Sequence, residues 1–145
     1  MNFKTSVPNF YSIDDLKEEE SWHETIKISE DMVEKFMALT CDKAPVHVDS
    51  SLALKMGYKR SIVHGFLVGN GFSGILGMFL PGSNTVIHKV LLEMISPVYM
   101  DDIIEYKVKV SRIIPAVKSV LLELTAVNQG GQLVSKGSAT CVFRS

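Results

Sequence analysis

The chain has 145 residues, of which 46% are apolar, so it is long enough for one domain with its own hydrophobic core. Its net charge is −1 with acidic and basic side chains interspersed, which excludes the basic surface typical of nucleic-acid-binding proteins. The two cysteines show no metal-binding or redox spacing, and the first ten residues contain no leader-like apolar stretch. We therefore expect a cytoplasmic protein with reduced thiols.

The predicted elements begin after a polar segment, residues 1–20, which we expect to pack loosely on a single domain formed by the whole chain. Residues 22–28 alternate weakly between apolar and polar side chains and predict a first strand. Ser29 is followed by two acidic residues, a pattern typical of a helix N-cap and first turn. Apolar side chains at helical spacing continue this helix to about Leu39.

The next segment, residues 40–49, contains a proline and is predicted to be a loop. Asp49 and Ser50 are suitable N-caps for a second short helix, which ends near Gly57. We therefore assign Asp49 to capping rather than to chemistry.

The longest apolar run, residues 66–80, predicts a helix. About 20 residues from Ser61 onward could cross a bilayer. Residues 61–80 nevertheless contain five glycines and several polar residues, and no second span or flanking basic cluster accompanies them. We therefore predict a buried central helix and no membrane span. Glycine inside a helix costs about 1 kcal/mol relative to alanine. A close neighbour, such as a tightly wrapped sheet, would explain the four interior glycines, which are Gly69, Gly71, Gly74 and Gly77.

The C-terminal half is predicted to supply an antiparallel sheet. Apolar and polar residues alternate over 104–110 and again over 120–126, and the pair of glycines at 130–131 turns the chain into a last strand over 133–143. With a further strand at 85–95, the element order is that of an α+β fold. One edge of such a sheet stays unpaired, so we expect a homodimer.

Three residues in the middle of the chain suit proton-transfer chemistry on a thioester. Adding water across the double bond of an enoyl thioester needs a base, a proton for the α-carbon and a donor for the charge on the thioester oxygen. His47 can be the base, because imidazole titrates near neutrality, and Asp42 can hold the same water or relay the second proton. The N–H of Gly65, at the start of the central helix, can receive the oxygen. This chemistry needs no metal or other cofactor.

The motifs around these residues resemble a known family. They read Asp42-Lys43-Ala44-Pro45-Val46-His47, then Ile62-Val63-His64-Gly65, then Phe72-Ser73-Gly74-Ile75-Leu76-Gly77, with further similarity at 97–102 and 129–131. Over roughly residues 22–143 the chain resembles the MaoC-like hydratases of the hotdog fold, in particular the R-specific enoyl-CoA hydratases.

The resemblance implies a sheet wrapped around a long central helix, with an overhang that carries the catalytic pair, Asp42 and His47, above the tunnel of a homodimer. It implies that Gly65 supplies the oxyanion N–H, and that Ser73 helps to order the site. The neighbours of Gly65 at the substrate-binding helix entrance are Val63 and His64. We expect His64 to hydrogen-bond the backbone rather than to act as a base. The substrates implied are enoyl and (R)-3-hydroxyacyl thioesters of CoA or acyl carrier protein.

One position departs from the family pattern. Ala44 stands where the family has Asn, which removes an amide able to hydrogen-bond within the loop. Two alternatives to a hydratase therefore stay open: an acyl thioesterase of the same fold, and a non-catalytic acyl-binding dimer. The usual thioesterase layout places its acid on the central helix, whereas residues 66–80 contain no Asp or Glu. Ala44 is the main support for the binding-only alternative.

Overall fold

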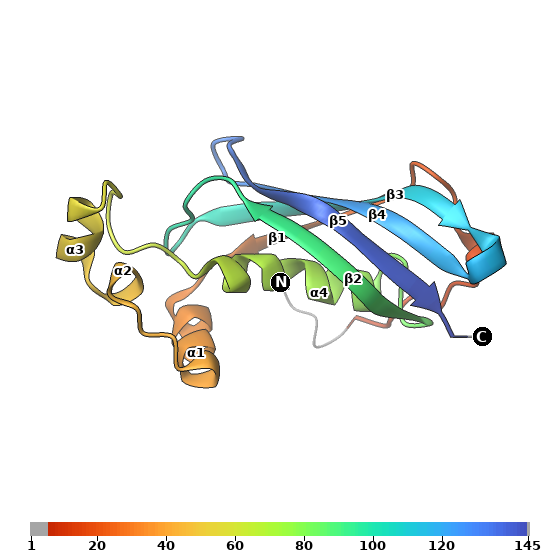
Figure 1. Cartoon of the computed structure of the whole chain (residues 1–145), viewed down its shortest axis with the longest axis horizontal. Coiled ribbons are helices and arrows are strands. Elements are labelled where there is room, and N and C mark those ends of the chain that lie inside the picture. Colours follow the sequence, from red (N-terminus) through yellow and green to blue (C-terminus); the bar gives the residue numbers. More distant parts are fainter. Residues whose placement is uncertain (1–5, 145) are drawn as a thin grey trace.

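In the computed structural model, which describes residues 6–144, a five-stranded antiparallel sheet curls around one central helix (Figure 1). The strand order is β1-β3-β4-β5-β2. The strands are β1 (Ser21–Lys27), β2 (Thr85–Met94), β3 (Ile103–Ile114), β4 (Ser119–Val127) and β5 (Leu133–Phe143). The helices are α1 (Glu30–Thr40), α2 (Pro45–Val48), α3 (Ser50–Lys55) and α4 (Gly65–Met78), with short 3-10 turns at Ile13–Asp15 and Pro115–Val117.

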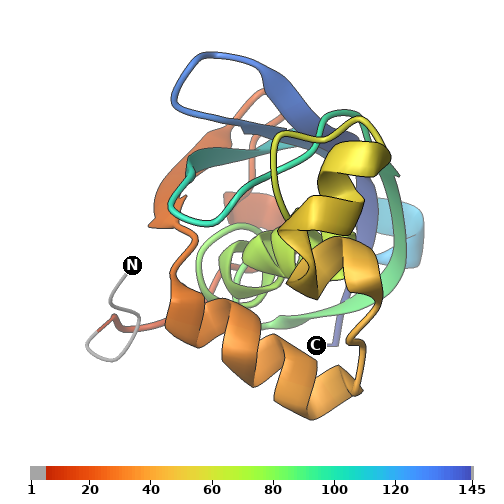
Figure 2. The ribbon, with the colours of Figure 1, turned by 90° about the vertical axis from the view of Figure 1, so that its left-hand side faces the viewer.

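Alternation along β3 and β4 creates the concave face of the sheet. Every second side chain over residues 103–110 of β3 and 120–127 of β4 is buried, and the buried members are Ile104, Tyr106, Val108, Val110, Val120, Leu122, Leu124 and Ala126. Full burial of one such aliphatic side chain stabilises a fold by about 1.5–3 kcal/mol. The predicted α+β arrangement, a sheet wrapped around a long helix, is confirmed, and Figure 2 shows the sheet curving over α4 from the end of the molecule.

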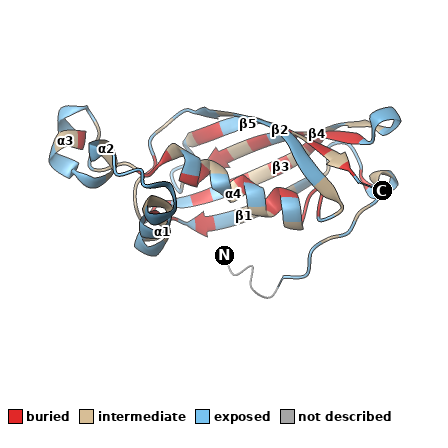
Figure 3. Cartoon of the chain, turned by 60° about the horizontal axis from the view of Figure 1, so that its bottom comes forward, coloured by how far each residue is buried: buried red, intermediate tan, exposed pale blue. Residues whose placement is uncertain are grey.

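The central helix α4 packs one face into this sheet. Its buried residues are Leu67, Val68, Phe72, Ile75 and Leu76. The opposite face, which includes Phe66, Asn70 and Ser73, is exposed and is visible as pale patches along α4 in Figure 3. Among the residues that the structure describes, no helix is both long and apolar enough to span a membrane.

Two of the interior glycines of α4 have close neighbours. A Cβ on Gly71 would collide with the ring of Tyr106, and a Cβ on Gly69 would lie 2.9 Å from Cδ1 of Leu92. The predicted close approach is therefore confirmed at these two positions, where the neighbours are side chains of the sheet. Gly77 differs, because a Cβ there meets no atom of the described residues within 4 Å.

Helix α1 begins and ends where local chemistry predicts. The hydroxyl of Ser29 accepts a hydrogen bond from the N–H of Met32, which confirms the predicted N-cap. The helix ends because Cys41 adopts a left-handed conformation, with φ of 59°, and its N–H donates to the carbonyl of Met37.

The prediction of a loop over residues 40–49 is wrong in part. Residues 45–48 form the single helical turn α2, in which proline occupies the first position and pre-sets the helical φ. The cap of α3 is Asp49, whose carboxylate accepts hydrogen bonds from the N–H groups of Ser51 and Leu52, while Ser50 is the first helical residue. Together, residues 41–61 form an overhang that projects beyond the sheet (Figure 1).

The sequence predicts that residues 1–20 pack loosely, but the described part of this segment is attached to the rest of the domain by several contacts. Leu16 is buried in the core, the N–H of Asn9 donates to the carbonyl of Met78, and the N–H of Glu19 donates to the carbonyl of Val110. These contacts attach the segment to both α4 and β3. Residues 1–5 lie outside the described part of the chain.

Candidate active site

A cavity of about 900 Å³ lies between α1, the overhang, α4 and the edge strand β2. Aromatic and aliphatic side chains make up most of its lining, which suits an apolar ligand. The polar side chains on its wall are Thr40, Asp42, His47, His64, Asn70 and Ser73.

Asp42 is positioned by the end of α1. Its Oδ1 accepts a hydrogen bond from the N–H of Ala44 at 3.1 Å, so the loop folds around its own carboxylate. Half of the Asp42 side chain, 47%, is exposed, and its Oδ2 lies 4.0 Å from Nε2 of His64. The carboxylate is therefore braced at one oxygen and directed toward the histidines at the other.

His47 is oriented by a main-chain carbonyl on the far side of the overhang. Its Nδ1 lies 2.8 Å from the carbonyl oxygen of Ile62. Because a carbonyl oxygen can only accept, we assign the ring hydrogen to Nδ1, which donates this bond. The neutral ring then presents a lone pair at Nε2, the form in which histidine acts as a general base.

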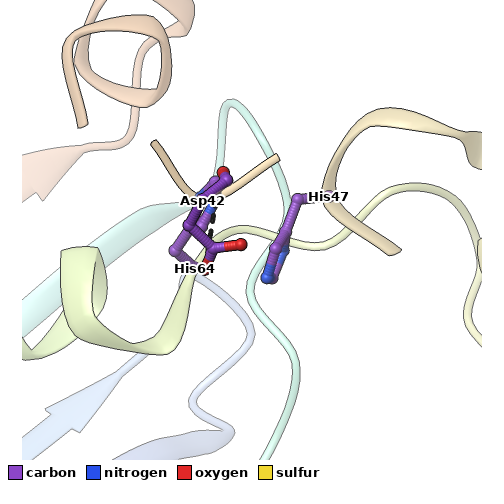
Figure 4. A group of neighbouring side chains, drawn as sticks. All are labelled: Asp42, His47 and His64. Atoms are coloured by element: carbon purple, nitrogen blue, oxygen red, sulfur yellow. Dashed lines mark hydrogen bonds and ion pairs between the residues drawn. The ribbon is translucent and has the colours of Figure 1, made fainter. Parts of the chain in front are cut away.

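Folding brings the predicted acid and histidine together. One side-chain atom each of Asp42, His47 and His64 lies within 4.8 Å of the other two, and Figure 4 shows the Asp42 carboxylate and the two rings facing one another. A hydrogen bond from the N–H of Ile62 to the carbonyl of Val46 closes the overhang back onto the entrance of α4. One water molecule can span a gap of this size and hydrogen-bond to both side chains.

Gly65 supplies the third element of the site. It is the first residue of α4 and lines the cavity, so its N–H has no acceptor within the helix and lies at the positive end of the helix dipole. Among residues 6–144 this N–H makes no backbone hydrogen bond. It is therefore available to a ligand oxygen.

Two further predicted site residues, Ser73 and Val63, line cavities in this region. Ser73 lies on the exposed face of α4, two turns beyond Gly65, and lines the cavity. Val63 is buried in the core and lines a second cavity of about 460 Å³, which shares His47 and Gly65 with the first. The N–H of Val63 donates to the carbonyl of Val98 at 2.7 Å, which anchors the helix entrance to the connection between β2 and β3.

The two histidines and the carboxylate are a poor metal site. The rings of His47 and His64 are stacked, with centroids 3.8 Å apart and planes inclined by 26°. Lone pairs lie in the ring planes, and planes with this separation and inclination meet far beyond the roughly 2.1 Å of a metal–nitrogen bond. The arrangement therefore favours proton transfer over metal binding.

Sequence reasoning missed two residues of the site. Ile62 acts through its carbonyl oxygen, which carries no sequence signal. Phe36 of α1 packs against the His64 ring, with centroids 5.1 Å apart, and lines the cavity. The helical periodicity predicts that Phe36 lies on the apolar face of its helix. Only the fold, which puts α1 beside the overhang, shows that this side chain lies in the site.

Comparison with known proteins agrees with this geometry. A family model described as "MaoC like domain" matches residues 15–129. This chain belongs to the MaoC-like family. Its MaoC-like domain is 34% identical over 107 residues to the (R)-specific enoyl-CoA hydratase of Aeromonas caviae, which covers 74% of this chain and 80% of that protein.

Two further relatives have related names. The (R)-specific enoyl-CoA hydratase of Rhodospirillum rubrum is 32% identical over 127 residues, with 88% of each chain covered. The 3-hydroxybutyryl-CoA dehydratase of Methylorubrum extorquens is 32% identical over 113 residues, with 78% of this chain and 71% of that protein covered.

Solved structures establish the fold of this MaoC-like chain. The (R)-hydratase from A. caviae superposes with a TM-score of 0.84 at 29% identity, over 89% of this chain and 98% of that chain. The R-hydratase PhaJ1 from Pseudomonas aeruginosa superposes with a TM-score of 0.83 at 27% identity, over 95% of this chain and 86% of that chain. The fold is the hotdog fold that the sequence motifs imply.

Proposed function

We propose that this protein catalyses the reversible addition of water to a trans-2-enoyl thioester, giving an (R)-3-hydroxyacyl thioester carried by CoA or acyl carrier protein. The observation that carries the proposal is that Asp42, His47 and Gly65 line one largely apolar cavity, with side-chain atoms of Asp42 and His47 within 4.8 Å of each other. The names of the relatives, hydratases and a dehydratase of CoA thioesters, support the same reaction.

In the hydration direction, one water molecule is held between Asp42 and His47. His47 takes a proton at Nε2 while the water oxygen adds to C3 of the enoyl group. Electron density moves to the thioester oxygen, which accepts a hydrogen bond from Gly65 at the positive end of α4. The acid–histidine pair then returns the proton to C2, so the elements of water are added and no group is left over. Dehydration is the reverse.

The substitution at Ala44 is compatible with catalysis. The Asp42 carboxylate is held by the main-chain N–H of Ala44, a bond that any residue at this position except proline can make. The brace on the carboxylate therefore survives the loss of the Asn side chain. Helix α4 contains no Asp or Glu, which counts against the thioesterase alternative.

Hydration of crotonyl-CoA by purified protein is the direct test. The enoyl thioester absorbance should fall without release of free thiol. Release of thiol would indicate hydrolysis instead, and an unchanged absorbance with substrates of several chain lengths would contradict the proposal.

Site variants assign the activity to the proposed pair. Asp42→Asn and His47→Gln should each lower kcat/KM by about 100-fold or more, because each removes a proton-transfer group. The matched controls are Asp31→Asn, which removes an exposed carboxylate of α1, and His23→Ala, which removes a half-exposed ring of β1. Both controls should keep wild-type activity. Wild-type turnover by the Asp42 and His47 variants would contradict the site assignment.

We also propose that the protein is a homodimer. The edge strand β2 pairs only with β5 within the sheet, and Val90 and Met94 on β2 are 41% and 48% exposed. Phe66 of α4, which lines the same cavity as Val90 and Met94, is 85% exposed. An unpaired strand edge flanked by apolar side chains is self-complementary about a two-fold axis, so a second copy is the partner that fits.

Light scattering after size exclusion should give twice the 16.1 kDa mass of one chain. Phe66→Glu should shift the protein toward the monomer, whereas Leu54→Glu, at an exposed apolar residue of α3, should leave the dimer intact. A wild-type monomer at all concentrations would contradict the proposal.

A further inference from the structure

The side chain of His64 makes a hydrogen bond that is not part of the capping of α4. It occupies the N-cap of α4, yet its side chain makes no capping hydrogen bond. The ring is only 2% exposed, and its Nε2 lies 2.9 Å from the main-chain carbonyl oxygen of Asp42, 22 residues earlier. Because that oxygen can only accept, Nε2 carries the hydrogen and donates.

This bond joins two parts of the site that otherwise belong to different elements. Asp42 lies on the overhang, whereas the N–H of Gly65 belongs to the peptide that follows His64 itself. The carbonyl of His64 accepts a hydrogen bond from Val68, so the start of α4 is fixed. The His64 side chain therefore sets the distance between the carboxylate that holds the water and the N–H that receives the thioester oxygen.

The same ring also supports the proposed base. His47 stacks on His64 with ring centroids 3.8 Å apart, and Phe36 packs against His64 at 5.1 Å. The charged or titratable groups facing His64 are the Asp42 carboxylate, at 4.0 Å, and His47. Nδ1 of His64 is buried and has no hydrogen-bond partner among the described residues. The side-chain hydrogen bond of His64 within the described residues is therefore the one from Nε2 to the carbonyl of Asp42.

We propose that His64 is a positioning residue for the hydration reaction, acting through its Nε2 hydrogen bond to Asp42 and its stacking on His47. This inference rests on the proposed function. A shift of about 1 Å between reacting groups can lower a rate by about 100-fold. Loss of the bond should therefore lower kcat far more than it changes KM.

Three substitutions separate this role from a merely structural one. The amide nitrogen of Gln falls near the place of Nε2, and that of Asn near the place of Nδ1, while Leu fills the space without a donor. His64→Gln should keep kcat within about 10-fold of wild type, whereas His64→Asn and His64→Leu should lose about 100-fold. KM should change by less than about threefold in all three variants.

A nitrogen-15 NMR spectrum of the wild type provides a readout that does not depend on turnover. The neutral His64 ring should carry its hydrogen at Nε2, and this signal should persist in Asp42→Asn, which leaves the main-chain carbonyl in place. A hydrogen on Nδ1 would overturn the proposal, as would wild-type kcat in folded His64→Leu or a better rescue by Asn than by Gln. An active wild type with any of these results overturns the role of His64 alone. An inactive wild type with the Nε2 hydrogen in place overturns the proposed function.

Discussion

Ala44 occupies the N-cap of α2, the single helical turn that carries His47. The methyl side chain offers no oxygen to the free N–H groups at the start of this turn, whereas the Asn expected from the family pattern is among the best N-caps. The main chain of Ala44 contacts both members of the proposed pair. Its N–H donates to the Asp42 carboxylate, and its carbonyl accepts from the N–H of His47.

Restoring this amide gives a test at the scale of one residue. Ala44→Asn should stabilise α2 by about 1 kcal/mol and raise kcat several-fold, because a better ordered turn holds His47 in place for more of the time. Steady-state kinetics with crotonyl-CoA and hydrogen exchange of the overhang amides measure the two effects. Ala44→Gln is the matched control, since its longer side chain caps poorly. An equal gain in the Gln variant would exclude capping as the cause.

A second pair of residues tests the packing of α4. Gly71 faces the ring of Tyr106, which is fully buried and held by a hydrogen bond from its hydroxyl to the carbonyl of Val68. Gly71→Ala should lower the free energy of unfolding by about 1–3 kcal/mol, because this ring cannot move aside. Gly69→Ala, whose new methyl meets the flexible ends of Leu92 and Met94, should cost less than about 1 kcal/mol. Urea unfolding of both variants checks the order, and equal losses would contradict it.

At the scale of elements, the overhang is attached to the sheet through the turn at residues 97–102. The N–H of Lys59 donates to the hydroxyl of Tyr99, and the guanidinium of Arg60 donates to the carbonyl of Met100 at 2.7 Å. The turn is itself braced by Asp102, whose carboxylate accepts from the N–H of Tyr99 and from the amide of Gln129. The family similarity at 97–102 and at 129–131 thus belongs to one hydrogen-bonded unit.

This brace can be broken without changing side-chain size. Asp102→Asn replaces two acceptor oxygens with one, so either the N–H of Tyr99 or the amide of Gln129 loses its acceptor. The free energy of unfolding should fall by about 1–3 kcal/mol. The neighbouring substitution Asp101→Asn breaks only an exposed ion pair with Lys27 and should cost little. Urea unfolding measures both. A larger loss at Asp101 would show that the turn depends on the surface pair instead.

The elements differ in how far sequence alone predicts them. Strands β3 to β5 and helix α4 follow from periodicity, since each buries a regular set of apolar side chains such as Val108 and Ile75. The turn α2 does not, because a four-residue helix has too little periodicity and is held by the long-range bond from Ile62 to Val46. The hydrogen-bond acceptors of His47 and His64 are likewise main-chain carbonyls. Any residue supplies such a carbonyl, so these two hydrogen bonds could not be predicted from the sequence.

At the scale of the whole molecule, the core buries two side chains that ionise only at high pH. Cys141 of β5 and Tyr106 of β3 have no exposed surface. Burial raises the pKa of Cys141 from 9.0 to about 12, and a hydrogen bond with Thr85 opposes this in part. Burial also raises the pKa of Tyr106 above its usual value. Both groups therefore stay protonated in the folded chain at pH values where they ionise in the unfolded chain.

The fold should lose stability in alkaline solution for this reason. The contribution of Cys141 is complete below pH 9.0, its unfolded pKa, and is lost as the pH rises toward about 12. The free energy of unfolding should fall with a slope approaching about 1.4 kcal/mol per pH unit for this thiol, and Tyr106 should add to the slope above about pH 10. Cys141→Ala should flatten the slope between about pH 9 and 10, whatever its effect on stability at neutral pH. Cys41→Ala, which removes the exposed thiol, is the matched control and should keep the wild-type slope in urea unfolding under reducing conditions. An unchanged slope in Cys141→Ala would show that another group controls the alkaline limit of this fold.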